Sequence, residues 1–358
     1  MLLLAASLVL AGAQSGVKSL PPSESALWAR LRPSLAVISQ NGQALGPAVF
    51  ISQDGYAVAN SLVVQRGAED IITSNGLTYK FKVEANDGAS QLCLVKTTTL
   101  PAGITTVSPA DASDGVSGPI IAVMPSGVLR AELTGGEKIG VDQQTKRTFP
   151  ISEVRVEQSA LQMGGALLFS QNGHLIGALF AALAQGNAQK DGPSAQGQVY
   201  QNNSRGQQFP VTNQAANRNV LGPQSMVVAY TPTWEVTSKA ISGFLSPEKK
   251  PHYGVLGVFV VDSKATGVEI TSVQKGTGAD AAGLQVGDVI IGIDGTPIRN
   301  QIDFSRAIYR LQPGSVVIVS IQRQGLTQTK TVTVGAQLAE EVLRQQSAIG
   351  SSDSPDIH

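Results

Sequence analysis

The sequence predicts an all-β-dominated protein made of two strand-rich units in tandem. Of its 358 residues, only 15% are charged and 5% are aromatic, while glycine occurs 38 times. This balance is typical of turn-rich β proteins rather than helical bundles. Apolar segments of strand length recur with DG and NG turn signals between them, and no helical segment separates the early ones. That order favours an antiparallel barrel or sandwich over a parallel α/β sheet.

The chain begins with an apolar run of signal-peptide length. The segment MLLLAASLVLAGAQS contains Ala11-Gly12-Ala13, which matches the small-x-small pattern of a cleavage site, although no Lys or Arg precedes the run. The run is too short to span a bilayer. We therefore expect residues 1–13 to be a signal peptide. The protein is then exported to the periplasm, the cell envelope or the exterior, with no integral membrane segment after cleavage.

The first unit is expected over residues 14–245. It opens with a short amphipathic helix in ESALWARL, which ends before Pro33 because the residue preceding a proline disfavours helical geometry. A strand then begins near Leu35. The strands expected after it are PAVFISQ, GYAVANSLVV, DIITSN, LTYKFKVEAN, SQLCLVKTT, GPIIAVMP, ALLFSQ, HLIGALFAAL and SMVVAYTP. The segment WEVTSKAISGFL is expected to form a closing helix.

Residues 184–225 interrupt this order. Gln, Asn and Gly dominate the segment, and apolar side chains are sparse. So little apolar surface cannot offset the entropy of ordering the backbone. We therefore expect a long mobile loop between two strands of the first unit.

Charge and residue counts argue against several classes of function. The 26 basic residues balance the 26 acidic ones, which leaves no electrostatic footprint for nucleic acid or an anionic membrane. Three histidines scattered along the chain and one cysteine do not suggest a metal site. The glycine-rich GVEITSVQKGTGAD lacks the Lys-Ser ending of a phosphate loop, so no cofactor is expected. Cys93, between apolar neighbours, is expected to be a small core residue.

The second unit is expected over residues 252–336, after the charged linker SPEKKPHY, and residues 337–358 form a tail with a short helix. Its strand segments are GVLGVFVV, GVEITSVQ, DVIIGIDG, SVVIVSIQR and TKTVTVG, with a helix in IDFSRAIYRL. The sequence LGV, then GVEITSVQKGTGADAAGLQVGDVIIGIDGTPI and LQPGSVVIVSIQR, closely resembles a bacterial PDZ domain of the type appended to exported proteases. The resemblance implies a β-rich α+β domain.

Such domains bind the extended C-terminus of a partner, which adds a strand to the sheet while backbone N–H groups hold its carboxylate. The resemblance implies that the loop around this carboxylate is formed by Val255, Leu256, Gly257 and Val258. The other wall of the groove would be the helix, on which three apolar residues recur at i, i+4 and i+7: Phe304, Ile308 and Leu311. These three residues fit the domain core equally well.

With the second unit placed, the first resembles the trypsin-like domain of the HtrA/DegP protease family. The similarity runs through RPSLAVIS, GYAVANSLVV, SQLCLVK, GPIIAVMPSG, LQMGGALL, GHLIGAL and MVVAYTP. It implies a double β-barrel with a Ser-His-Asp triad. The chemistry needs all three members, because Ser is a weak nucleophile unless His takes its proton and Asp orients that His.

In this chain the three triad positions carry other residues. The family histidine lies in T-N-x-H-V-V, where ANSLVV has Leu62. The aspartate lies in D-L-A-V-L-K, where SQLCLVK has Gln91. The serine lies in G-N-S-G-G-P-L, where ALQMGGALL has Met163. Leu161 replaces the glycine that precedes the serine by two positions in the oxyanion loop. The resemblance therefore implies a pseudoprotease with no catalytic residues.

Two alternatives remain open. An active trypsin-like endopeptidase with a displaced triad would need a base, but His174, His252 and His358 all follow the family's histidine position. Ser61 and Ser159 lie near the triad positions and are expected to be ordinary hydroxyls. The other alternative is a structural subunit in mixed oligomers with active family members.

The preferred hypothesis is an exported, inactive HtrA-like scaffold or chaperone-like protein. Its PDZ domain would bind C-termini or unfolded segments of envelope proteins. Family members form trimers through their N-terminal region, where Trp28 is a candidate contact, so we expect a homo-oligomer or a mixed oligomer.

Overall fold

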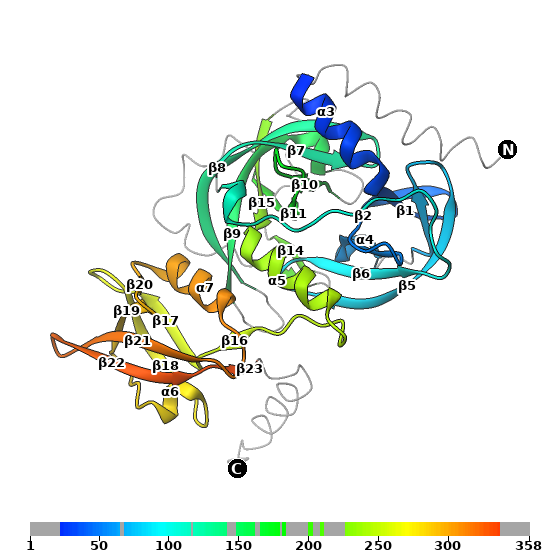
Figure 1. Ribbon diagram of the computed structural model, residues 1–358. Coiled ribbons are helices and arrows are strands. Elements are labelled where there is room, and N and C mark those ends of the chain that lie inside the picture. Colours follow the sequence, from blue (N-terminus) through cyan, green and yellow to red (C-terminus); the bar gives the residue numbers. More distant parts are fainter. Residues whose placement is uncertain are drawn as a thin grey trace, which may run out of the picture. The chain divides into compact units, whose positions relative to one another are not determined.

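The computed structural model describes residues 22–64, 68–115, 117–141, 148–161, 165–179, 181–183, 200–202, 208–210 and 226–336 (Figure 1). The chain passes from one compact unit to a second one between Pro251 and His252. The architecture is mostly β, as the sequence predicted. None of the described helices combines the length and the apolar content needed to cross a membrane. Met163, His358 and the tail from residue 337 onward lie outside the described residues.

The first unit opens with a helix and a closed six-stranded barrel. Helix α3 (Pro22–Leu31) gives way to a 3-10 turn (Arg32–Ser34) at Pro33, as the proline predicted. The barrel order is β1-β2-β3-β6-β5-β4, with antiparallel neighbours. The strands are β1 (Leu35–Gln40), β2 (Gln43–Phe50), β3 (Tyr56–Asn60), β4 (Asp70–Thr73), β5 (Thr78–Asp87) and β6 (Leu92–Thr97).

A seven-stranded sheet forms the second half of this unit, in the order β11-β10-β7-β8-β9-β15-β12. Helix α5 (Trp234–Leu245) follows β15, where the sequence predicted it. The strands are β7 (Ser117–Met124), β8 (Gly127–Val141), β9 (Thr148–Glu157), β10 (Leu167–Phe169), β11 (Leu175–Ala178), β12 (Ala181–Leu183) and β15 (Met226–Pro232). Strands β8 and β9 were not among the expected segments, because polar and glycine residues interrupt their apolar pattern.

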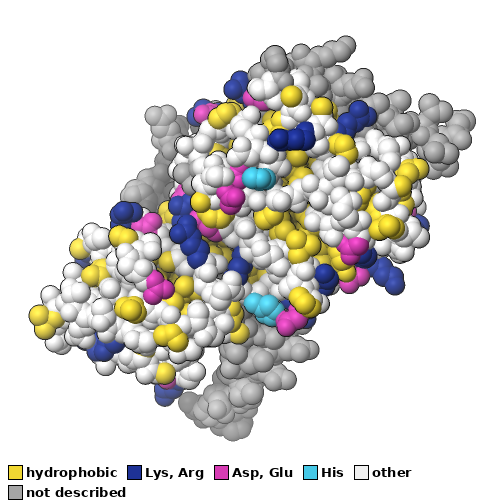
Figure 2. Space-filling view, in the orientation of Figure 1, with side chains coloured by type: hydrophobic (Ala, Val, Ile, Leu, Met, Phe, Trp, Pro, Cys, Tyr) yellow, Lys and Arg dark blue, Asp and Glu magenta, His cyan; other side chains and the backbone are white. Residues whose placement is uncertain are grey.

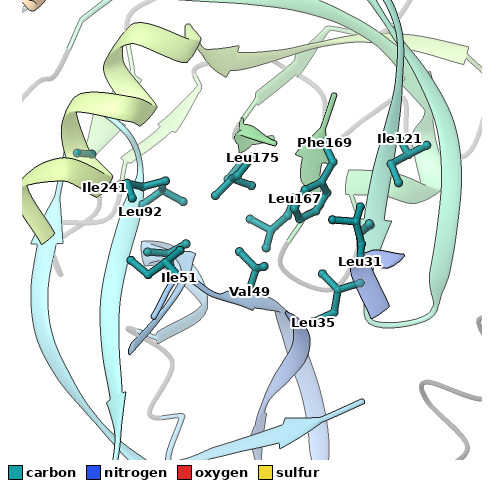
Figure 3. Packing of buried hydrophobic residues seen from close by; sticks show 14 of the residues in the cluster. Leu31, Leu35, Val49, Ile51, Leu92, Ile121, Leu167, Phe169, Leu175 and Ile241 are labelled. Carbon is teal, nitrogen blue, oxygen red and sulfur yellow. The ribbon is translucent and has the colours of Figure 1, made fainter. Parts of the chain in front are cut away.

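One apolar core joins the barrel to this second sheet. Figure 3 shows Val49 of the barrel next to Leu167 of β10, which also carries Phe169, and Leu92 of the barrel beside Ile241 of α5. The described members of the cluster come from α3, the barrel, the second sheet and α5. Because the barrel and the second sheet pack on the same core, the strand ends of the barrel are held at fixed positions relative to those of the second sheet.

Trp28 also belongs to this core. Its exposed fraction is 6%, so its ring packs inside the unit rather than facing a neighbouring subunit. The expectation that Trp28 contributes to a subunit contact was therefore wrong, because α3 turns its apolar stripe inward.

Figure 2 shows basic and acidic side chains interspersed over the face it draws, in keeping with the balanced charge of the chain.

Strands β12 and β15 pair antiparallel, with Ala182 opposite Ala229, so residues 184–225 connect two neighbouring strands of one sheet. Within that connection the structure describes a short antiparallel pair, β13 (Tyr200–Asn202) and β14 (Gln208–Pro210). The connection between two strands of one unit is as expected, and it includes this short strand pair. Each of the two strands contains an aromatic residue, and aromatic residues favour β-strands. The average composition of residues 184–225 does not reveal this local preference.

Within its described residues, the second unit contains an antiparallel sheet and two helices. The sheet order is β17-β18-β19-β21-β22, with β20 beside β19, while β16 pairs with β23. The strands are β16 (Gly254–Val255), β17 (Val258–Asp262), β18 (Val268–Val273), β19 (Val289–Ile293), β20 (Thr296–Pro297), β21 (Val316–Arg323), β22 (Leu326–Thr333) and β23 (Gly335–Ala336). The helices are α6 (Gly278–Ala281) and α7 (Gln301–Arg310).

Helix α7 starts and stops at residues with clear capping roles. Asn300 is its N-cap, because the Asn300 Oδ1 accepts a hydrogen bond from the Asp303 amide at 2.9 Å. The helix ends at Arg310, and Leu311 has extended backbone angles. Leu311 was expected to lie on the helix, one of three apolar residues at i, i+4 and i+7, but it lies one residue beyond it.

Candidate functional site

Leu62 lies in α4 (Ser61–Val64), a single helical turn directly after β3. The sequence had predicted that the strand continues here. The Asn60 Oδ1 caps the turn by accepting a hydrogen bond from the Leu62 amide at 2.9 Å. The Ser61 amide donates to the Gln91 carbonyl at 2.9 Å. Two of the three candidate triad positions, at Leu62 and Gln91, are therefore neighbours in space.

Gln91 stands immediately before β6 with a φ of +58°, at the end of a tight turn. Its side-chain amide donates to the Gly88 carbonyl, and the Asp87 Oδ2 accepts a hydrogen bond from the Ser90 amide at 2.8 Å. The Gln91 side chain is buried and neutral. It therefore supplies no negative charge to stabilise a cation beside it.

The segment that follows Met163 reaches the same place from the second sheet. Met163 itself is outside the described residues. Gly165 has a φ of +81°, and the Leu179 amide donates to the Ala166 carbonyl at 3.0 Å. The Asn60 side chain donates in turn to the Leu179 carbonyl at 3.3 Å. A chain of hydrogen bonds thus ties Ala166, three residues after Met163, to the turn that carries Leu62.

Leu161 lies at the end of a 3-10 turn (Gln158–Leu161). Its half-buried side chain packs against the apolar cluster of the second sheet. The neighbouring Ala160 is fully buried in the same cluster. Apolar packing therefore holds Leu161 at the end of this 3-10 turn.

The residue types at these positions do not support acyl transfer. Leu62 has no group that takes a proton, and Gln91 has no carboxylate to orient a base. A thioether, such as that of Met163, has no proton to lose and behaves as an adaptable apolar group. Nucleophilic catalysis needs a nucleophile whose proton a neighbouring base removes.

A Ser, a His and an Asp do come together elsewhere in the first unit. The His174 Nδ1 lies 2.9 Å from the Asp114 Oδ2, and Ser170 hydrogen-bonds to the same carboxylate. Burial opposes ionisation of Asp114, but hydrogen bonds from Ser170, the Asp111 amide and His174 prevail, so the pKa of Asp114 is lowered. A triad needs the histidine between the serine and the aspartate. Here the aspartate lies between the other two.

His174 also lies close to two carboxylates. The sequence did not suggest this cluster, because its histidines are scattered along the chain. Single ligand atoms of Asp111, Asp114 and His174 lie within 4.8 Å of one another. Their oxygens already accept hydrogen bonds, at 2.7 Å from the Ser113 amide to Asp111 and at 3.0 Å from the Asn172 side chain to Asp114. The Asp111 amide also donates to the Asp114 Oδ2 at 2.9 Å, so the two carboxylates form the capping box of a 3-10 turn. The cluster therefore has a structural explanation.

Cys93 is a core residue, as the sequence predicted. It is fully buried in the barrel, where its Sγ lies 3.5 Å from the Ala59 carbonyl. Burial raises the pKa of the Cys93 thiol to about 12. The thiolate, which is the reactive form, is therefore almost absent at neutral pH.

We expect iodoacetamide to leave Cys93 unmodified in the folded chain at pH 8. The thiolate fraction of a group with a pKa of about 12 is on the order of a thousandfold below that of an ordinary thiol at this pH. Mass spectrometry of the folded chain should show no adduct, and the same chain in denaturant should be modified completely. Rapid modification without denaturant would mean that the barrel opens beside Gln91.

In the second unit, the loop at residues 255–258, here called the carboxylate loop, presents unpaired amides. The Leu256 carbonyl accepts a hydrogen bond from the Ala279 amide at 3.0 Å, and the Gly257 carbonyl accepts one from the Gln274 amide at 2.8 Å. The amides of Leu256 and Gly257, in contrast, donate to no backbone carbonyl of the residues described here. Two fixed carbonyls thus hold two free N–H groups in place, an arrangement suited to an anion.

The predicted groove residues divide into core and lining. Leu256 has an exposed fraction of 2% and, with Phe304, belongs to the core cluster, so their side chains are not available to a ligand. Of the two interpretations that the sequence left open for Phe304, groove wall or core, the structure favours the core, and Leu256 offers only its backbone to the carboxylate loop. Val258, Ile308 and Leu311 are partly buried against the same cluster and keep some exposed apolar surface.

Strand β17 ends the order of its sheet, with β18 as its neighbour among the described strands. Helix α7 lies against the other side of β17 (Figure 1). The carboxylate loop therefore stands at the beginning of an edge strand, next to a helix. An extended peptide could pair with this edge while its carboxylate meets the free amides.

Known proteins resemble this chain in both of its units. The family model described as the PDZ domain matches residues 254–334. A probable periplasmic serine endoprotease, DegP-like, from Rhizobium meliloti is 26% identical over 310 residues, which is 86% of this chain and 54% of the relative. The chain spans about half the length of the curated relatives it matches.

Solved structures agree with this comparison at the level of fold. The HtrA-type protease AlgW with tripeptide has a TM-score of 0.58 at 20% identity, over 89% of this chain and 98% of that one. AlgW with decapeptide has a TM-score of 0.56 at 17% identity, over 87% of this chain and 98% of that one. The chain therefore has the architecture of the HtrA/DegP-like serine proteases, in which a trypsin-like barrel unit precedes a PDZ domain.

Proposed function

We propose that this chain is an exported, catalytically inactive HtrA-like protein whose PDZ domain binds polypeptide in the cell envelope. The observation that carries the binding half is the pair of free amides, of Leu256 and Gly257, at the start of the edge strand β17. Curated relatives are named periplasmic, which supports a location in the envelope. The barrel unit then acts as a scaffold or a chaperone-like body.

The inactive half rests on residue types and on connectivity. Leu62 and Gln91 occupy adjoining turns, and hydrogen bonds through Asn60 and Leu179 tie these turns to the loop after Met163. Two of these three candidate triad side chains are apolar and the third is a neutral amide, so none of them transfers a proton at neutral pH. The proposal takes these positions as the lost triad.

The alternative of a displaced triad draws on the names of the relatives, which are endoproteases. Its best candidate in the described residues is the group of Ser170, Asp114 and His174. Asp114 contacts both other members, whereas a triad places the histidine between the serine and the aspartate. This geometry disfavours the alternative.

We expect the full chain to bind decapeptides with a free C-terminal carboxylate on a peptide array, and to bind their C-terminally amidated twins at least tenfold more weakly. Amidation removes the charge that the amides of Leu256 and Gly257 would hold, and a hydrogen bond to a charged group contributes about 1.5–3 kcal/mol. Fluorescence anisotropy of the strongest pairs gives the affinities. Equal binding of the free and amidated forms would contradict the assigned role of the carboxylate loop.

A further inference from the structure

The edge of β17 is already contacted by a side chain of the same unit. Gln301, the first residue of α7, donates from its Nε2 to the Val260 carbonyl at 2.7 Å. The Gln301 backbone amide donates to the Asp262 Oδ1 at 2.6 Å. The beginning of α7 is therefore tied to the middle and the end of β17.

The orientation of the β17 carbonyls shows what this contact occupies. The Gly257 carbonyl accepts from the Gln274 amide at 2.8 Å, and the Phe259 carbonyl accepts from the Thr271 hydroxyl at 3.2 Å. The carbonyls of Gly257 and Phe259 therefore face β18 and Gln274, the residue that follows it. Successive carbonyls of a strand point to opposite sides.

The next carbonyls in the alternation, those of Val258 and Val260, consequently face the open edge. For Val260 the hydrogen bond from Gln301 shows this directly. A strand added to this edge would use both carbonyls as acceptors, two residues apart. One of the two, at Val260, already accepts a hydrogen bond from the Gln301 Nε2.

We propose that Gln301 limits recognition to the last two residues of a C-terminus. This inference rests on the proposed function. A ligand whose carboxylate lies at the free amides of Leu256 and Gly257 must run antiparallel to β17. Its last residue then pairs at Val258, and its third residue from the end pairs at Val260. That third amide approaches the Val260 carbonyl from the open edge, where it competes with the Gln301 Nε2 for the hydrogen bond.

The consequence is a preference between the two ligand classes of the proposed function. A free C-terminus gains its charge-assisted bonds at the carboxylate loop and needs only Val258 on the edge. An internal unfolded segment has no carboxylate and depends on pairing along the edge, where Gln301 competes at Val260. The domain therefore selects chain ends over internal segments.

The test uses the full chain and two probes: the decapeptide that binds best on the array, and its acetylated C-terminal dipeptide. In the wild type we expect the two affinities to agree within about threefold. The substitution Gln301→Ala should strengthen decapeptide binding by about threefold to tenfold, as expected for release of one backbone acceptor. It should leave the dipeptide unchanged, because the dipeptide has no third amide.

A decapeptide N-methylated at the third amide from the end separates this role from a general effect on folding. It should bind the wild type as the parent does and should lose the gain that Gln301→Ala gives the parent. The matched control is Gln322→Ala, at an exposed glutamine of β21, which should change nothing. Unchanged or weaker decapeptide binding by Gln301→Ala would overturn the inference. Failure of every variant to bind any peptide would instead contradict the proposed function.

Discussion

The purified chain is expected to release no peptides from a denatured protein substrate above background. In another serine protease, loss of the serine or the histidine alone lowers turnover by about 10⁶, and only roughly 10³ to 10⁴ over water remains. Here Leu62, Gln91 and Met163 occupy the three candidate triad positions. Cleavage by this chain should therefore fall below that of an active relative by at least about 10⁶. Release of labelled fragments from unfolded casein measures it.

Two variants locate the chemistry if activity does appear. An active relative, assayed under the same conditions, shows that the substrate can be cut. Activity that survives Met163→Ala would mean that the nucleophile lies elsewhere, and activity lost in His174→Ala would point to the group around Asp114. Either result would replace the pseudoprotease hypothesis with that of a displaced triad.

The substitution Gly257→Ala is expected to abolish measurable binding of C-terminal peptides, with a loss of at least tenfold to a hundredfold. Gly257 has a φ of +90°, which costs a residue with a Cβ about 1–3 kcal/mol. A Cβ there would lie 2.2 Å from the Thr277 Oγ1, so the loop must move as well. Its two free amides then lose their common orientation. Anisotropy titration with the best decapeptide measures the loss.

The matched control is Gly325→Ala in the turn between β21 and β22. Gly325 also has a positive φ, of +79°, but an added Cβ would have nothing within 4 Å. The Gly325→Ala substitution imposes similar backbone strain at a site away from the carboxylate loop. Peptide binding should therefore persist while Tm falls by a few degrees. If Gly257→Ala bound peptide as well as Gly325→Ala does, the carboxylate loop would not be the binding site.

Local patterns located many of the strands. Apolar runs bounded by turn residues located β1, β7, β15, β19 and β21, because a strand buried on one or both faces leaves that trace in the sequence. The pattern failed at β8, where adjacent glycines and exposed charges hide the strand. It also failed at Ser61, where a hydrogen bond to Gln91, thirty residues along the chain, accompanies a helical turn after β3.

By itself the sequence determined the residue types available for chemistry: an apolar residue, an amide and a thioether at the three candidate positions, and a glycine in the carboxylate loop. No fold can give Leu62 a proton to exchange. Only the tertiary structure decided which groups meet. It placed Asp114 between Ser170 and His174, and it brought Gln301 to Val260 across 41 positions of chain. Such contacts depend on how strands and helices far apart in the sequence pack together, and no local sequence pattern specifies that packing.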